Sequence, residues 1–96
     1  MPNLPSTATP ERRSGVLAQQ VQPGDTIVLL NPKSGEYYTL DAVGSRAWQL
    51  CDGKRTISEM ATMLSQEFDA PPDVIESDIL ELMKDLLDEG LVDAAR

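Results

Sequence analysis

Short runs of apolar, β-branched and aromatic residues, separated by polar turn residues, predict three short strands in the first half of the chain. Residues 26–30 are β-branched and apolar on both faces, which is typical of a central strand. A weaker strand candidate, residues 16–21, precedes them, with a turn at residues 23–25 between the two. The loop at residues 31–35 then leads into Glu36–Leu40. We expect an antiparallel meander with Glu36–Leu40 at its edge.

Two tyrosines stand side by side in Glu36–Leu40, namely Tyr37 and Tyr38, followed by Thr39. Successive side chains of a strand point to opposite faces, so both tyrosines cannot enter one core. One interpretation is a core aromatic on one face and a surface aromatic on the other. The other is an interaction site, because interface anchors are often tyrosine and an edge strand offers unpaired backbone groups. We favour the interaction site.

Capping residues and helical periodicity predict three helices in the second half. Asp41 is a good N-cap for the first, with Gly53 as its left-handed C-cap. Thr56 opens a capping box for the second helix. Pro72 suits the first turn of a third helix, which Gly90 ends. The expected fold class is therefore α+β, a three-stranded antiparallel sheet followed by three helices.

The third predicted helix carries more apolar surface than a surface helix usually has. Its apolar positions cover roughly half of the circumference, where about 100° is often enough. Within this arc, Ile75, Ile79, Leu82 and Leu86 form a narrow stripe, which Leu80, Met83 and Leu87 widen. We expect part of the arc to pack on the other helices and the remainder to contact the sheet or a partner.

Composition narrows the classes of partner. The net charge of −8 disfavours binding to nucleic acid phosphates and to anionic membranes. No apolar run approaches the roughly 18–20 residues of a membrane span, and no secretion signal opens the chain. One cysteine cannot form an internal disulfide. We expect a cytoplasmic protein with no nucleic acid or membrane partner, in which residues 1–13 are a disordered tail and residues 14–96 one domain.

The residues offer little for catalysis. The chain has no histidine, which removes Ser-His-Asp and Cys-His mechanisms and the commonest metal ligand. Cys51 has no partner base in the sequence and is better interpreted as a buried structural thiol, and Trp48 as a core residue. Gly44 within a helix start indicates close backbone packing. We expect no enzyme, no metal and no cofactor.

Several short motifs together resemble the PqqD-like family. They are residues 28–31, residues 35–41, Gly44, Trp48, residues 52–53, residues 56–57 and residues 89–91. The resemblance covers residues 16 to 92. It implies a three-stranded sheet followed by three helices in a winged-helix-like arrangement. It also implies a recognition element for ribosomally made, post-translationally modified peptides (RiPPs), a peptide chaperone in natural product biosynthesis.

The resemblance also implies a binding mode. The leader segment of a precursor peptide would add as a strand to Glu36–Leu40 and lie against the third helix, and the complex would present the peptide to a modifying enzyme such as a radical-SAM protein or a leader peptidase. The implied site residues are Glu36, Tyr37, Tyr38, Thr39, Leu40, Ile79, Leu80, Met83 and Leu87. Members that serve pyrroloquinoline quinone tend to carry Pro-Glu after the second strand, where this chain has Asn31-Pro32. This departure favours another peptide pathway, with lasso peptides as one alternative.

Two other functions stay open from the residues alone. A winged-helix DNA-binding protein would read DNA with its second helix, which offers Thr62, Ser65 and Gln66 but no basic cluster. A structural dimerisation domain would use the wide apolar face of the third helix. The leader-binding module is the function that we favour.

Overall fold

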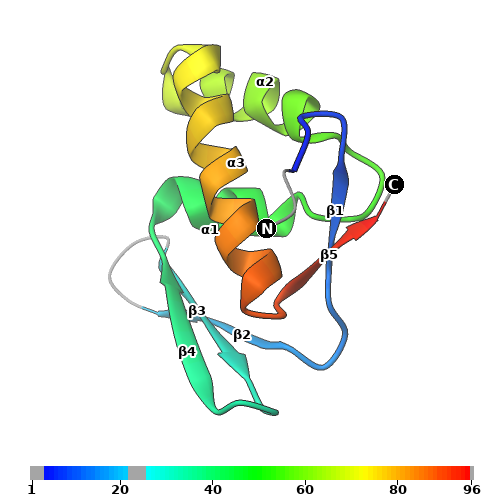
Figure 1. Ribbon diagram of the computed structural model, residues 1–96. Coiled ribbons are helices and arrows are strands. Elements are labelled where there is room, and N and C mark those ends of the chain that lie inside the picture. Colours follow the sequence, from blue (N-terminus) through cyan, green and yellow to red (C-terminus); the bar gives the residue numbers. More distant parts are fainter. Residues whose placement is uncertain (1–3, 22–25, 96) are drawn as a thin grey trace.

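The computed structural model describes residues 4–21 and 26–95, and the predicted turn at residues 23–25 lies outside them. A three-stranded antiparallel sheet has the order β2 (Leu17–Val21), β3 (Thr26–Asn31) and β4 (Glu36–Leu40). In the middle strand β3, the side chains of Ile27 and Leu29 are buried. The structure thus confirms the predicted meander, its central strand and the edge position of β4 (Figure 1).

Three helices follow the sheet, α1 (Ala42–Gln49), α2 (Ile57–Phe68) and α3 (Pro72–Asp88). Their starts are as predicted. Asp41 accepts a hydrogen bond from the Gly44 amide at 2.8 Å, and Thr56 forms a capping box. The predicted C-cap at Gly53 is wrong, because α1 ends at Gln49 with Leu50 as its cap. The α+β class and the three helices are confirmed, while the winged-helix-like arrangement stays a prediction.

A second sheet contradicts the predicted disorder of residues 1–13. β1 (Thr9–Arg12) pairs antiparallel with β5 (Val92–Ala95), although Pro10 stands within β1. Pro10 breaks no bond between β1 and β5, because its peptide groups point away from β5 toward residues 51–53, where its carbonyl accepts a hydrogen bond from the Gly53 amide at 3.0 Å. Residues 1–3 lie outside the described part of the chain. The N-terminal segment from residue 9 onward is therefore part of the fold.

The core lies between the three helices and one face of the three-stranded sheet, which α1 contacts directly (Figure 1). α1 contacts β3 and β4 as well as both other helices, and α3 packs on α2, α1 and β5. Trp48 and Cys51 are buried in this core, as predicted. No helix among the described residues is long and apolar enough to cross a membrane. This packing leaves the outer side of β4 uncovered beside α3.

Candidate functional site

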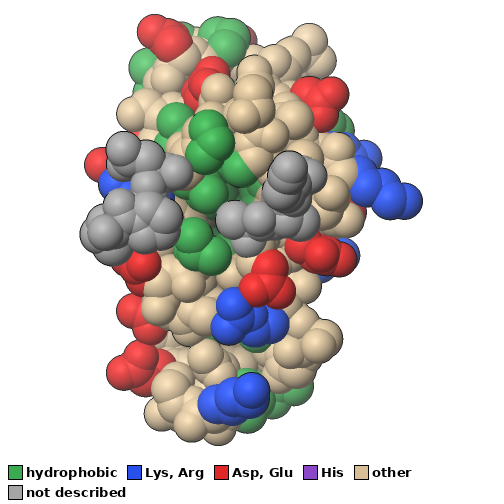
Figure 2. Space-filling view, turned by 45° about the vertical axis from the view of Figure 1, so that its right-hand side comes forward, with side chains coloured by type: hydrophobic (Ala, Val, Ile, Leu, Met, Phe, Trp, Pro, Cys, Tyr) green, Lys and Arg blue, Asp and Glu red, His purple; other side chains and the backbone are tan. Residues whose placement is uncertain are grey.

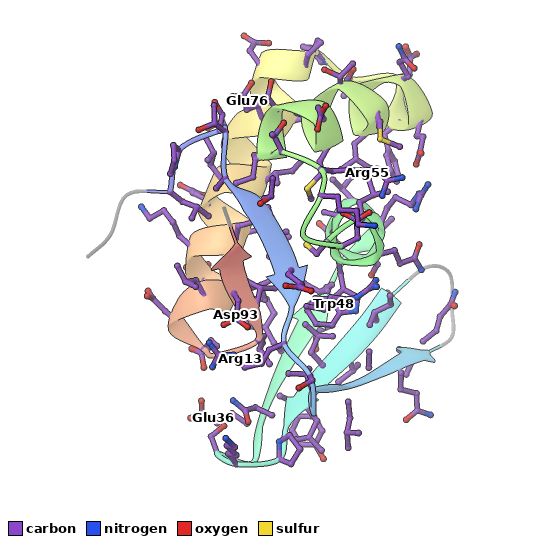
Figure 3. All side chains as sticks on the ribbon, turned by 90° about the vertical axis from the view of Figure 1, so that its right-hand side faces the viewer. Arg13, Glu36, Trp48, Arg55, Glu76 and Asp93 are labelled. Carbon is purple, nitrogen blue, oxygen red and sulfur yellow. The ribbon has the colours of Figure 1, made fainter. Side chains whose placement is uncertain are left out.

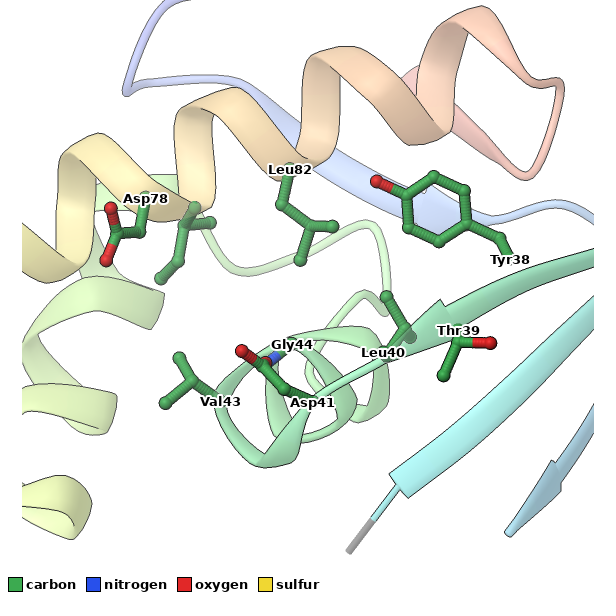
Figure 4. Close-up of a pocket in the computed structure, with 9 residues that line it drawn as sticks. Tyr38, Thr39, Leu40, Asp41, Val43, Gly44, Asp78 and Leu82 are labelled. Atoms are coloured by element: carbon green, nitrogen blue, oxygen red, sulfur yellow. The ribbon is translucent and has the colours of Figure 1, made fainter. Parts of the chain in front are cut away.

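A hollow of about 380 Å³ lies between β4, the start of α1 and the middle of α3 (Figure 4). Leu40, Val43 and Leu82 give it an apolar wall, and the carboxylates of Asp41 and Asp78 stand beside them. The complete lining is Tyr38, Thr39, Leu40, Asp41, Val43, Gly44, Asp78, Ile79 and Leu82. We call this hollow, together with the open side of β4, the β4–α3 groove.

Gly44 lets α1 and α3 approach each other at the bottom of the groove. A Cβ atom at this position would stand 3.2 Å from Asp41 Oδ1 and 3.4 Å from Leu82 Cδ2. Those distances are tight enough that one of the two neighbours would have to move. The glycine therefore keeps the Asp41 cap and the Leu82 wall in place, which confirms the close packing predicted from the sequence.

The outer side of β4 has no strand beside it within the described residues, because β3 is its one neighbour in the sheet. The Ile27 amide donates to Ser45 Oγ at 3.0 Å, and this hydroxyl donates to the Leu40 carbonyl at 3.2 Å. Ile27 and Leu40, which are paired in the register, thus turn their peptide groups toward each other. Since peptide groups alternate in direction along a strand, those of Tyr37 and Thr39 point away from β3 to the open side.

The two tyrosines of β4 face different surroundings, as their alternation predicts. Tyr38 is half-buried and faces α3, where its hydroxyl donates to Asp85 Oδ2 at 3.3 Å. Burial, and then the negative charge of Asp85, raise the pKa of Tyr38. Tyr37 is on the opposite face of the sheet with 71% of its surface exposed. Tyr38 therefore belongs to the groove, while Tyr37 contributes its backbone to the open side of β4.

Acidic side chains gather at the far end of β4, where α3 ends. A hydrogen bond to Glu36, and then the like charge of Glu36, raise the pKa of Glu89. Asp85 also contributes to this shift, as does Asp88. The groove thus has carboxylates at both of its ends, Asp41 with Asp78 at one and Glu36 with Glu89 at the other.

The chain matches known proteins over most of its length. Residues 26–92 match the model of the family described as coenzyme PQQ synthesis protein D (PqqD). The chain belongs to the PqqD family. A relative named PqqA binding protein, from Xanthomonas axonopodis pv. citri, is 34% identical over 92 residues, which are 96% of this chain and 98% of the relative. The family resemblance seen in the sequence is confirmed.

Solved structures agree with the PqqD assignment. The solution NMR structure of the PqqD truncation of Methylobacterium extorquens PqqCD is described as a functional, stand-alone RiPP recognition element. It matches with a TM-score of 0.73 and 31% identity, over 88% of this chain and 87% of that one. The structure of lasso peptide synthetase B1 complexed with the leader peptide matches with a TM-score of 0.76 and 26% identity, over 90% and 99% of the two chains.

Four of the nine predicted site residues of this PqqD family member line the hollow, namely Tyr38, Thr39, Leu40 and Ile79. Glu36 and Tyr37 lie along β4 beside it. Leu80, Met83 and Leu87 do not line the hollow, and their role in peptide binding stays a prediction. Met83 is fully buried, with its Sδ 3.7 Å from Cys51 Sγ.

The rotation of α3 about its axis explains this difference. At about 100° per residue, Leu80 lies about 160° around the helix from Leu82, which lines the hollow. Sequence reasoning missed Asp41, Val43, Asp78 and Leu82 as lining residues. Leu82 carried a signal, because it belonged to the narrow apolar stripe with Ile79. Asp78 carried none, because an acidic residue on a helix of an acidic chain is typical of a solvated face.

The thiol of Cys51 is in an environment that makes it unreactive. Burial raises its pKa to about 12, so the thiol is protonated at neutral pH, and it donates to the Ala47 carbonyl at 3.3 Å. The prediction of a structural thiol is confirmed. Among the described residues, no three His, Cys, Asp or Glu side chains are placed to share a metal ion.

Proposed function

We propose that this chain is a non-catalytic recognition module that binds the leader segment of a ribosomally made precursor peptide. The leader adds as a strand along β4 and lays alternate side chains into the β4–α3 groove. The observation that carries the proposal is the open side of β4, with the peptide groups of Tyr37 and Thr39 turned outward beside a hollow walled by α3. Backbone pairing gives affinity, and pockets beside the strand give selectivity.

The relatives support a peptide as the guest. A curated relative is named for binding PqqA, and a solved structural neighbour was determined with a leader peptide. Delivery of the bound peptide to a modifying enzyme in the cytoplasm, such as a radical-SAM protein, a leader peptidase or a lasso peptide synthetase, is part of the proposal. We infer no cofactor for this role, because strand addition needs backbone groups alone.

The side chains of α2 give little support to a DNA-binding function. The hydroxyl of Thr62 donates to the Ser58 carbonyl at 3.2 Å, and that of Ser65 donates to the Thr62 carbonyl at 3.1 Å. Both hydroxyls are thus bonded within their own helix, and α2 has no basic residue in its last turn. Reading of base edges needs donors and acceptors that project from the helix, commonly with Arg or Lys nearby.

Proline substitution on the open side of β4 tests strand addition. Thr39→Pro removes an outward amide and puts a ring in the path of an added strand, while the bonds of β4 to β3 are kept. We expect the affinity for the leader encoded beside the gene, measured by titration calorimetry, to fall about tenfold or more. Circular dichroism should show an unchanged fold.

The matched control is Ala18→Pro, at the other edge of the same sheet. Ala18 is exposed on β2, and by the same alternation its peptide groups also point away from β3. This variant should bind the leader like the parent protein. Equal binding by the Thr39→Pro variant, or equal losses in the two variants, would refute strand addition at β4.

A further inference from the structure

Acidic residues recur along the groove-facing side of α3. Asp78, Asp85 and Glu89 fall within an arc of roughly 60° around the helix, and Leu82 lies in the same arc. Leu82 and Asp78 line the hollow, and Asp85 bonds to Tyr38 of β4. A guest in the groove would therefore meet carboxylates at intervals along this wall, with an apolar contact between them.

The wall formed by β4 shows the same order of acidic and apolar residues, and β4 runs in the opposite direction to α3. Glu36 begins β4 and faces Glu89 at the end of α3, while Asp41 follows β4 and lines the hollow with Asp78. Five strand residues and eleven helix residues both span about 16 Å, so the two acidic ends stand opposite each other. Between them lie Leu40 and Leu82. The groove is thus acidic, apolar and acidic along its length.

No basic side chain in the described part of the chain forms an ion pair with these carboxylates. The ion pairs there are Arg13 with Asp93, Arg46 with Glu67 and Arg55 with Asp52, so each of these arginines is bonded to a carboxylate outside the groove wall. One oxygen of Asp41 is occupied by the Gly44 amide, and Asp85 accepts from the Tyr38 hydroxyl. The raised pKa of Glu89 reflects the same group of carboxylates, since it is caused first by the hydrogen bond to Glu36 and the charge of Glu36, then by burial, and then by the charges of Asp88 and Asp85.

We infer that the segment received by the β4–α3 groove is a basic one, with Lys or Arg at two positions four residues apart and an apolar residue midway between them. Side chains of an added strand alternate, so residues at i, i+2 and i+4 face α3 and span about 13 Å. The outer two reach the acidic ends, and the middle one lies against Leu40 and Leu82. This inference rests on the proposed strand addition and adds the chemistry of the guest.

Two synthetic heptapeptides test the charge order. Both have leucine at the fourth residue and threonine elsewhere, with lysine at the second and sixth residues in one and glutamate in the other. We expect the lysine peptide to bind about tenfold tighter at low ionic strength, by titration calorimetry. The preference should shrink as salt is raised, because the contacts lie at a solvent-exposed surface.

A charge-matched pair of variants locates the effect. Asp78→Asn with Glu89→Gln removes one α3 carboxylate from each acidic end of the groove and should weaken the preference for lysine markedly. Glu11→Gln with Glu76→Gln removes two charges elsewhere, on β1 and about 160° around α3 from Asp78, and should leave the preference intact. Equal losses in both double variants would mean steering by net charge and would reject the inference.

The remaining outcomes separate this inference from the proposed function. If the natural leader binds and loses affinity in the Thr39→Pro variant, but the lysine peptide binds no better than the glutamate peptide or does not bind, strand addition stands and the basic guest is rejected. If neither the natural leader nor the lysine peptide binds, both proposals are rejected. If the Thr39→Pro variant still binds the lysine peptide as tightly as the parent protein, the strand geometry on which the inference rests is rejected.

Discussion

The side of α3 that meets the core and the side that faces β4 differ in both chemistry and packing. On the core side, Ile75, Ile79, Met83 and Leu86 are buried among the other helices and the sheet. On the groove side, Leu82 is half-buried between exposed carboxylates, and the neighbouring strand edge is open. One helix thus serves both as a core element and as the wall of a groove.

The β1–β5 side of the molecule differs from the open side of β4 in how its backbone groups and charged side chains are bonded. Arg13 donates to Asp93 at 2.6 Å, and its backbone amide donates to the Leu91 carbonyl at 3.1 Å (Figure 3). Acidic and basic side chains lie beside one another on the face that includes this side (Figure 2). Backbone groups and charges are paired there, whereas beside β4 both are left open. The open edge of β4 and the groove carboxylates, which form no ion pair within the described part of the chain, therefore make one continuous surface that leaves both backbone groups and negative charges available to a partner.

The largest expected effect separates the core side of α3 from the groove side. Met83→Ala removes a fully buried side chain beside Cys51, which should lower the free energy of unfolding by about 2–5 kcal/mol in urea denaturation. Where the variant is still folded, its affinity for the leader should stay near that of the parent protein. A variant of unchanged stability that no longer binds would mean that Met83 faces the guest after all.

A matched pair of leucines gives the next largest effect. Leu80 and Leu82 are both half-buried on α3, so alanine at either position should cost a similar amount of stability, about 1–2 kcal/mol. Only Leu82 lines the hollow, so Leu82→Ala alone should weaken leader binding, by about tenfold, in titration calorimetry. The reverse result would support the sequence-based assignment of Leu80 to the groove.

Local signals made much of this fold predictable. Glu36–Leu40 is a strand with the predicted bounds because β-branched and aromatic residues fill it and turn residues precede it. The capping box at Thr56 placed the start of α2 for the same reason, since all its hydrogen bonds join residues three apart. These elements depend on residues close in sequence, which is why the pattern alone indicated them.

The features that sequence reasoning missed depend on distant parts of the chain. Four residues of β1 have no strand pattern of their own, and they are ordered by pairing with β5 some 80 residues later. The sequence also did not show how α3 is rotated about its axis, because its apolar arc was too wide to indicate which part faces the core. Met83 rather than Leu82 took the buried position once α2 and the sheet were in place. The acidic order of the groove appears only when β4 and α3 lie side by side.

The smallest expected effect concerns the repulsion at the acidic end of the groove. The folded-state pKa of Glu89 is raised, so the stability that its protonated form contributes is present in acid and is lost as the pH rises through that pKa. Near pH 7, Glu89→Gln removes the repulsion from Glu36 and should raise the melting temperature by roughly one degree. The gain should vanish near pH 4, where Glu89 is itself largely protonated.

Glu76→Gln, on the opposite side of α3, should show no such pH-dependent gain, since acidic residues of the groove do not face it. A Glu89→Gln variant that melts below the parent at pH 7 would mean that a cation already compensates this end, and the contrast between the paired and unpaired sides of the molecule would be lost.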